Sequence, residues 1–247
     1  MEIGRFSVNT YDKTCLADAR RRGLGVEVED FLWPCGEAEL ARRREIAARA
    51  TAGFAARSFH GSAVSRDFLA ICAADAGQLR RLYDRSFELA RSLGIDAVVF
   101  HANYFGHMSA PAWVAAQAAF WRGYLCDKPA RARIYAENFV GETPRMLADL
   151  CDAVGDARFG LCLDVGHAGC NSNVPLRDWI SILGARIGHV HLHDNDGAAD
   201  RHWPPGRGSL DLRRAIQDIG RLPGAPAIVL ECDYAEGMRW VDEYLGQ

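Results

Sequence analysis

Residues 133–164 read RIYAENFVGETPRMLADLCDAVGDARFGLCLD, and this stretch contains the pattern on which the fold depends. It has two short apolar runs typical of buried strands, at Arg133–Asn138 and Gly160–Asp164. The segment between them, Thr143–Val154, begins with a Thr-Pro pair suited to a helix start and is followed by Gly155, a residue suited to a helix end. A strand, a helix and a second strand in this order predict two parallel strands joined by a crossover helix.

The same alternation recurs along the whole chain. Strands are predicted at Ile3–Asn9, Gly25–Phe31, Phe54–His60, Ala97–Ala102, Arg133–Asn138, Gly160–Asp164, Ile187–His193 and Ala227–Cys232. Helices are predicted at Asp12–Arg22, Glu37–Thr51, Gln78–Leu93, Ala112–Leu125, Thr143–Val154, Leu176–Leu183, Leu210–Ile219 and Gly237–Leu245. Strands that alternate with helices in this way favour an α/β fold in which a parallel sheet closes into a single (β/α)8 TIM barrel.

A single domain over residues 1–247 is expected, because the length suits one barrel and no linker or low-complexity segment divides the chain. The rival architecture is an open doubly wound sheet. That fold would favour a glycine-rich phosphate loop between a strand and a helix, and neither GxGxxG nor GxxxxGK[ST] is present.

Composition restricts the classes of function. The net charge is −3, which supplies no basic field for nucleic acid or anionic lipid. No apolar run approaches the roughly 18 residues of a membrane span, and the N-terminus lacks signal-peptide features, so a cytoplasmic protein is expected. The eight cysteines include no CxxC pair and are expected to be reduced thiols. The only lysines, Lys13 and Lys128, are not at predicted strand ends, which argues against Schiff-base chemistry.

Polar side chains gather where the predicted strands end. From the third strand to the eighth, each strand carries one imidazole or carboxylate at or near its end: His60, His101, Glu137, Asp164, His191 and Glu231. Barrel active sites form at this rim. Three more such residues, His167, Asp200 and His202, follow in the loops after the sixth and seventh strands. Imidazoles and carboxylates are ligands of zinc and manganese, and buried charges without partners are costly, so a divalent-metal site is predicted.

Neighbouring polar residues receive secondary roles. His189, His191 and His193 alternate and share one face of a strand, with His189 expected one layer deeper as a structural hydrogen bonder. His193 is expected to orient the loop or support the metal ligands. Glu29 is expected either to contact substrate or to brace a neighbour.

The motifs FHGS, VFHANY, YAENF, CLDVGHAG, HVHLHDNDG, DRHWPPGRG and LECD resemble those of the xylose isomerase-like TIM barrel superfamily. That superfamily includes sugar phosphate isomerases and epimerases, and also apurinic endonucleases of the endonuclease-four type. The resemblance extends from about His60 to Glu231, and motif order, strand position and residue type agree.

The resemblance implies two ligand sets. The epimerase branch implies one metal ion, zinc or manganese, on Glu137, Asp164, His191 and Glu231. The endonuclease branch implies three zinc ions on nine ligands, which adds His60, His101, His167, Asp200 and His202 to the same four. All nine residues are present, so the motifs leave both sets open and imply between one and three metal ions.

The preferred interpretation is a metal-dependent isomerase or epimerase of a sugar or sugar phosphate. Glu137 and Glu231 would be its catalytic residues, moving a proton through an enediolate intermediate. On that interpretation, substrate would contact the residues His60, His101, His167, Arg201, His202 and Trp203.

Two alternatives stay open. One is a multi-zinc phosphodiesterase resembling the apurinic endonucleases, although the acidic rim loops and the net charge disfavour nucleic acid as a partner. The other is a non-catalytic sugar- or metal-binding barrel. A homodimer is an expected assembly, since barrels of this kind often pair through exposed helices and loops.

Overall fold

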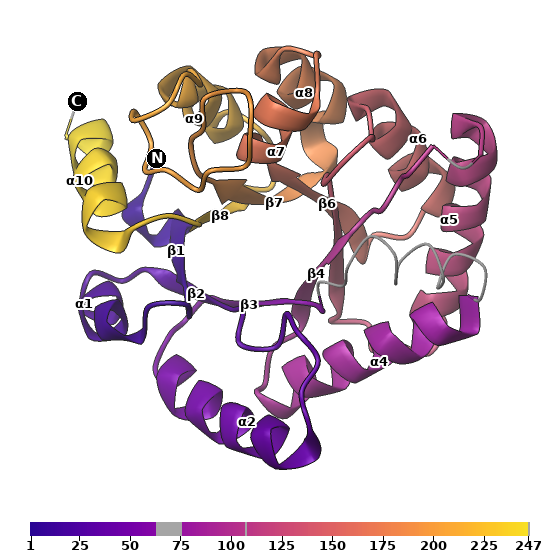
Figure 1. Cartoon of the computed structure of the whole chain (residues 1–247), viewed down its shortest axis with the longest axis horizontal. Helices are drawn as coiled ribbons and strands as arrows, with labels where there is room; N and C mark the ends of the chain where they lie inside the picture. Colours follow the sequence, from indigo (N-terminus) through magenta and orange to yellow (C-terminus); the bar gives the residue numbers. More distant parts are fainter. Residues whose placement is uncertain (63–75, 107, 247) are drawn as a thin grey trace.

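The structure is a computed structural model, and it describes residues 1–62, 76–106 and 108–246. Eight parallel strands form a closed barrel in which each strand pairs with the next and β8 pairs with β1 (Figure 1). The strands are β1 (Phe6–Asn9), β2 (Gly25–Val28), β3 (Arg57–His60), β4 (Ala97–His101), β5 (Arg133–Glu137), β6 (Phe159–Asp164), β7 (Ile187–Leu192) and β8 (Ala227–Leu230). The predicted α/β barrel is therefore confirmed.

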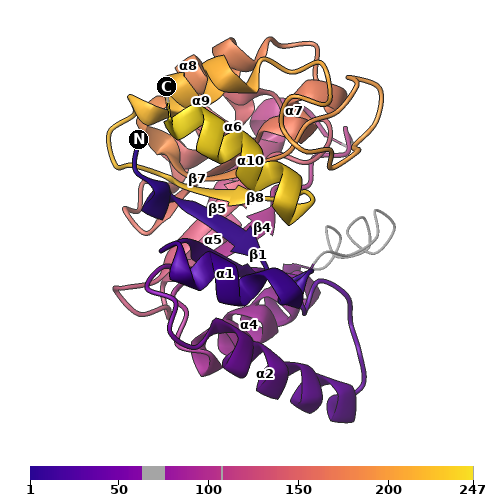
Figure 2. The same ribbon diagram turned by 90° about the vertical axis from the view of Figure 1, so that its left-hand side faces the viewer.

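Helices surround the ring of strands, as the two views at right angles show (Figures 1 and 2). They are α1 (Leu16–Arg21), α2 (Glu37–Thr51), α4 (Ala76–Ser92), α5 (Ala110–Leu125), α6 (Pro144–Val154), α7 (Val165–Asn171), α8 (Leu176–Leu183), α9 (Leu212–Gly220) and α10 (Tyr234–Leu245). Short 3₁₀ turns lie at Ile3–Arg5, Lys13–Cys15 and Gly184–Arg186. Among the described helices, none is long and apolar enough to cross a membrane.

Most predicted elements have their counterparts, and the differences have local causes. The second strand was expected to reach Phe31 but ends at Val28, where the Glu29 N–H donates to the Thr10 hydroxyl, 3.0 Å away, in place of a strand partner. Helix α7 was expected to be a loop. It forms because the Asp164 carboxylate caps it by accepting from the His167 N–H at 2.6 Å.

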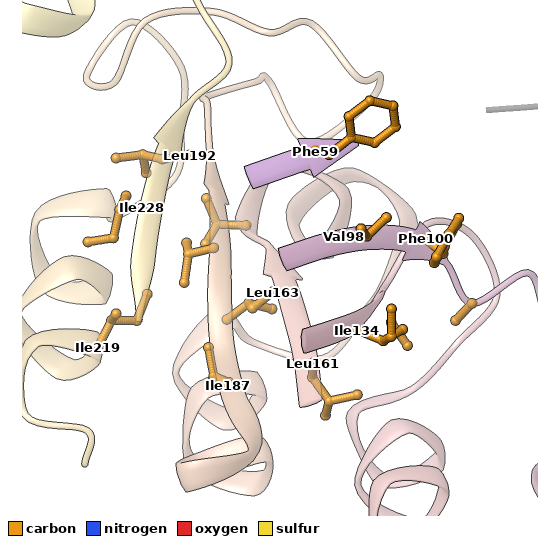
Figure 3. Packing of buried hydrophobic residues seen from close by; sticks show 14 of the residues in the cluster. Phe59, Val98, Phe100, Ile134, Leu161, Leu163, Ile187, Leu192, Ile219 and Ile228 are labelled. Atoms are coloured by element: carbon orange, nitrogen blue, oxygen red, sulfur yellow. The ribbon is translucent and has the colours of Figure 1, made fainter. Parts of the chain in front are cut away.

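The hydrophobic core lies between the strands and the helices. Figure 3 shows large apolar side chains on neighbouring strands, among them Phe59, Ile134 and Leu161, and all three are fully buried. In β7 the alternation of side chains puts Val190 and Leu192 on the face opposite His189 and His191. The apolar face therefore packs outward, and the polar face is left for the barrel interior.

Cysteines take no part in cross-linking within the described chain. The seven described cysteines are all free thiols, and Cys72 lies outside the described residues. Burial raises the pKa of the Cys15 and Cys151 thiols to about 11, so these two behave as small apolar side chains.

Candidate metal centre

A cavity of about 510 Å³ opens at the end of the barrel where the strands finish. Strands β3, β4 and β5 end in His60, His101 and Glu137, and all three line it. The full lining comprises Tyr11, Glu29, Leu32, Trp33, His60, His101, Glu137, Phe139, His167, Asp200, His202, Glu231, Cys232 and Asp233. The cavity therefore combines ligand-type side chains with an aromatic and acidic side formed after β1, β2 and β8.

The first set of ligand-type residues, the His191 group, consists of Glu137, Asp164, His191 and Glu231. The Nδ1 atom of His191 lies 3.2 Å from Glu137 Oε1 and 3.2 Å from Glu231 Oε1. The nearer oxygen of Asp164, Oδ2, is 3.8 Å from the same nitrogen. Four residues from β5, β6, β7 and the end of β8 thus converge on one point.

The second set, the His60 group, consists of His60 and His101 together with Glu137, which it shares with the first set. The Nε2 atoms of His60 and His101 lie 3.2 and 3.5 Å from Glu137 Oε2. Glu137 Oε1 faces His191 instead. The two oxygens of one carboxylate are therefore directed at two different groups of imidazoles.

The third set, the Asp200 group, consists of His167, Asp200 and His202. Asp200 Oδ2 lies 3.3 Å from His167 Nε2 and 3.2 Å from His202 Nε2. The structure therefore brings together all nine residues of the predicted set, divided among three groups, with Glu137 common to two of them.

Backbone carbonyls orient the imidazoles of these groups. The Nδ1 atoms of His60, His167 and His202 each lie 2.9 Å from a carbonyl oxygen, of Gly61, Asn138 and Glu231 respectively. A carbonyl only accepts, so each Nδ1 carries a proton, and each Nε2 is left facing a neighbouring carboxylate.

These residues fit a divalent metal. Glu137 Oε2 and His191 Nδ1 are buried and have no hydrogen-bond partner within the described chain, which is costly unless another ligand satisfies them. Ligand atoms of His60, Glu137 and His191 also lie within 4.8 Å of one another. Imidazole nitrogen combined with carboxylate oxygen is the donor set that zinc takes.

Burial and mutual contact shift the pKa values in this cluster. Burial acts to raise the pKa of Glu137, but His191 and His101 lower it well below its usual range. Burial lowers the pKa of His101 to about 4. Burial would also lower the pKa of His60 and His202, yet Glu137 and Asp200 raise these to about 9. Carboxylates and histidines that share a buried site thus shift one another's pKa, and His60 and His202 rise while His101 falls.

The loop after β7 carries Asp200 and His202 to the cavity, and Asp194 organises this loop. Its carboxylate accepts from the N–H groups of Gly206 and Gly208, both at 2.9 Å, and of Leu210 at 3.2 Å. His202 lies in this loop at a φ of 47°, in the left-handed region that non-glycine residues rarely adopt. The folded loop thus imposes the direction of the His202 side chain.

Two predicted substrate residues from the same loop lie beside the cavity. Arg201 pairs with Asp196 at 3.3 Å, and Trp203 is held by two backbone hydrogen bonds to Asp194. Neither is among the described residues that line the cavity. Their role in substrate binding stays a prediction.

Sequence reasoning missed Glu27. Its carboxylate is completely buried, 2.9 Å from His191 Nε2 and 2.8 Å from His189 Nε2. The strand pattern GVEVED contained a signal, because alternation puts Glu27 and Glu29 on the same face. Only Glu29 was considered, as the residue nearer the strand end.

The structure also places the three residues that were given secondary roles, Glu29, His189 and His193. Glu29 lines the cavity with a buried Oε1 that has no partner within the described chain, and burial and Glu231 raise its pKa well above the usual range. His189 is buried, and its Nε2 lies 2.8 Å from Glu27 Oε2. His193 Nε2 lies 3.1 and 3.2 Å from the two oxygens of Asp164, and its ring stacks on His202 at 4.1 Å.

Comparison with known proteins gives a consistent family. The model of the xylose isomerase-like TIM barrel matches residues 17–244. Among curated proteins, probable endonuclease 4 of Mycobacterium leprae (strain Br4923) is 28% identical over 171 residues, and that of Mycobacterium marinum is 29% identical over 169. Each match covers 64% of this chain and 64% of the relative, so the chain matches just under two thirds of their length.

Solved structures share the fold over nearly the whole chain. The TTHB071 protein of Thermus thermophilus, from a crystal soaked with ZnCl₂, has a TM-score of 0.72 at 22% identity and covers 100% of this chain and 98% of its own. A D-tagatose 3-epimerase-like protein has a TM-score of 0.72 at 17% identity, covering 98% and 97%. Endonuclease IV of Thermus thermophilus has 0.61 at 20% identity, covering 98% and 99%.

Proposed function

The chain belongs to the xylose isomerase-like TIM barrel family, and we propose that it is a zinc-dependent hydrolase of sugar phosphate esters. The observation that carries this proposal is the position of Glu137. One of its oxygens faces His191 at 3.2 Å, and the other faces His60 at 3.2 Å and His101 at 3.5 Å. A carboxylate with both oxygens directed at imidazoles would be suited to hold metal on both sides, and so to act as a ligand rather than as the base that removes a substrate proton.

The three groups of residues would hold up to three metal ions. The His191 group supplies four ligands, the His60 group supplies two imidazoles and shares Glu137, and the Asp200 group supplies three. Zinc, when bound, supplies Lewis-acid polarisation of a phosphate ester and charge compensation for its oxygens. This cluster goes beyond the four ligands that a single-metal epimerase needs.

The residues of the chain itself would then bind and orient the substrate. Trp33 and Phe139 border the cavity and offer apolar faces to a sugar ring. Glu29 presents a buried carboxyl with a raised pKa, which would donate a hydrogen bond to a substrate oxygen.

Sugar phosphate esters occur free and within nucleic acid. Net charge disfavoured nucleic acid as a partner, whereas the relatives named probable endonuclease 4 favour it. An oligonucleotide with an abasic site therefore forms one arm of the test, and free sugar phosphates form the other.

An epimerase is the second candidate, favoured by one specific contact. Glu137 Oε1 and Glu231 Oε1 each lie 3.2 Å from His191 Nδ1, so two glutamates border one metal position. Proton removal and return by such a pair would isomerise a ketose.

One set of assays separates the two reactions. The purified protein is loaded with zinc, its metal content is measured, and it is incubated in D₂O with ketoses, sugar phosphates and the abasic oligonucleotide. We expect about three zinc equivalents and release of phosphate or cleavage of the strand. One equivalent together with deuterium exchange into a ketose and no ester hydrolysis would establish the epimerase instead.

A further inference from the structure

His191 differs from the other imidazoles of the metal centre. His60, His167 and His202 present Nε2 to the ligands and bond Nδ1 to a backbone carbonyl. His191 has the opposite orientation, with Nδ1 toward Glu137 and Glu231. Its Nε2 points into the barrel, where a side chain takes the place of the backbone carbonyl.

Glu27 is that side chain. It comes from β2, and its Oε1 lies 2.9 Å from His191 Nε2, at hydrogen-bond distance. Neither β6 nor β8, the strands that pair with β7, supplies this contact, so it crosses the barrel interior. Glu27 and His191 are both completely buried, and water does not compete for the bond.

The other oxygen of Glu27 also faces an imidazole. Oε2 lies 2.8 Å from His189 Nε2, and the His189 ring stacks on Tyr135 at 5.4 Å. Gly188 leaves room for that tyrosine, because a Cβ there would come within 2.4 Å of the Tyr135 ring. The Glu27 carboxylate therefore lies buried between two imidazoles, and its Oε1 is at hydrogen-bond distance from His191 Nε2.

We propose that Glu27 is a positioning residue that fixes the tautomer and the direction of His191. A carboxylate oxygen 2.9 Å from Nε2 accepts its hydrogen bond, so the imidazole proton is held on Nε2 and the lone pair on Nδ1 is directed at the metal position. The inference rests on the metal-binding part of the proposed function, which both candidate reactions share.

The test measures zinc binding rather than turnover. Glu27→Gln keeps the shape of the side chain and removes its charge, and zinc affinities are measured by competition with a chromophoric chelator. We expect the affinity for one zinc ion to fall by about 10- to 100-fold. The affinities for the remaining zinc ions should stay within about threefold of those of the unsubstituted protein. Glu142→Gln is the matched control, because Glu142 is also buried but its oxygens accept from backbone N–H groups, those of Tyr104 and Phe139 among them, rather than from an imidazole. Equal affinities in Glu27→Gln and the unsubstituted protein would overturn the proposal.

A second measurement needs no variant, so it applies even where Glu27→Gln fails to fold. Histidine ¹⁵N spectra of the zinc-loaded protein are expected to show His191 protonated on Nε2 and metal-bound through Nδ1. Metal binding through Nε2 would refute the assignment. If the protein binds one zinc ion in total, that result contradicts a hydrolase with three metal ions. The zinc affinities of Glu27→Gln and of the unsubstituted protein at that one site would still decide the role of Glu27.

Discussion

At the scale of the residue, buried carboxyl groups in this protein have different neighbours and therefore different states. Glu137 lies among histidines, which lower its pKa. Glu142 is also buried, yet its oxygens accept from backbone N–H groups, those of Tyr104 at 2.9 Å and Phe139 at 3.1 Å. Burial outweighs these bonds and raises the pKa of Glu142 to about 7. Position relative to imidazoles thus decides which carboxylate is suited to hold metal.

Glu142 gives a prediction about pH. Its pKa is higher in the folded state than in the unfolded chain, so between about pH 4.5 and pH 7 the unfolded state loses its proton first and stability falls as pH rises. The loss is roughly 3 kcal/mol at most. Urea unfolding of the metal-free protein at pH 5 and pH 8, compared with Glu142→Gln, measures it. We expect a smaller pH-dependent loss in the variant, and equal losses in both proteins would contradict the assignment.

At the scale of the element, the strand ends and the helix that follows β6 build the centre together. Asp164 ends β6, caps α7 and belongs to the His191 group, while α7 carries His167. Gly166, in the first turn of α7, lies against the His193 ring. The close approach of helix and ring keeps His193 on the Asp164 carboxylate.

Gly166→Ala tests this packing. A Cβ at residue 166 would come within 1.9 Å of the His193 ring, so either the ring or α7 must move. We expect a loss of about 1–3 kcal/mol in unfolding free energy, with weaker zinc binding. Gly123→Ala in α5 is the control, because a Cβ there meets no atom within 4 Å, and it should stabilise the protein by about 0.5–1 kcal/mol. Chemical denaturation and zinc titration would detect both effects, and a stable Gly166→Ala with unchanged zinc affinity would disprove the packing argument.

The strands and loops also show how much of the candidate site could be predicted from the sequence. The order of the ligand-type residues along the chain predicted that they would meet, because parallel strands in a barrel end at one rim and His60, His101 and Glu137 each end a strand. Glu27 could not be assigned in the same way, since its partner His191 is distant in sequence and lies across the barrel. The position of Arg201 also escaped prediction, since it depends on how the loop after β7 folds.

At the scale of the whole molecule, the centre joins opposite parts of the chain. The nine ligand-type residues range from His60 to Glu231, and Glu27 adds a contact from β2 to β7. Bound metal would therefore link strands β3 to β8 through one cluster. Because ligands bind the folded state and not the unfolded chain, occupancy of this cluster adds directly to folding stability.

Removal of metal is therefore expected to destabilise the entire barrel. Zinc at about 1,000 times its dissociation constant contributes about 4 kcal/mol, which corresponds to a rise in Tm of roughly 8–16 °C for a protein of this size. Differential scanning calorimetry of the zinc-loaded and chelator-treated protein measures the change. Re-addition of zinc should restore the Tm. Magnesium should restore little of the lost Tm, because it prefers oxygen ligands, whereas His60, His101 and His191 supply nitrogen. A Tm that is the same with and without chelator would show that the nine residues do not act as a metal centre.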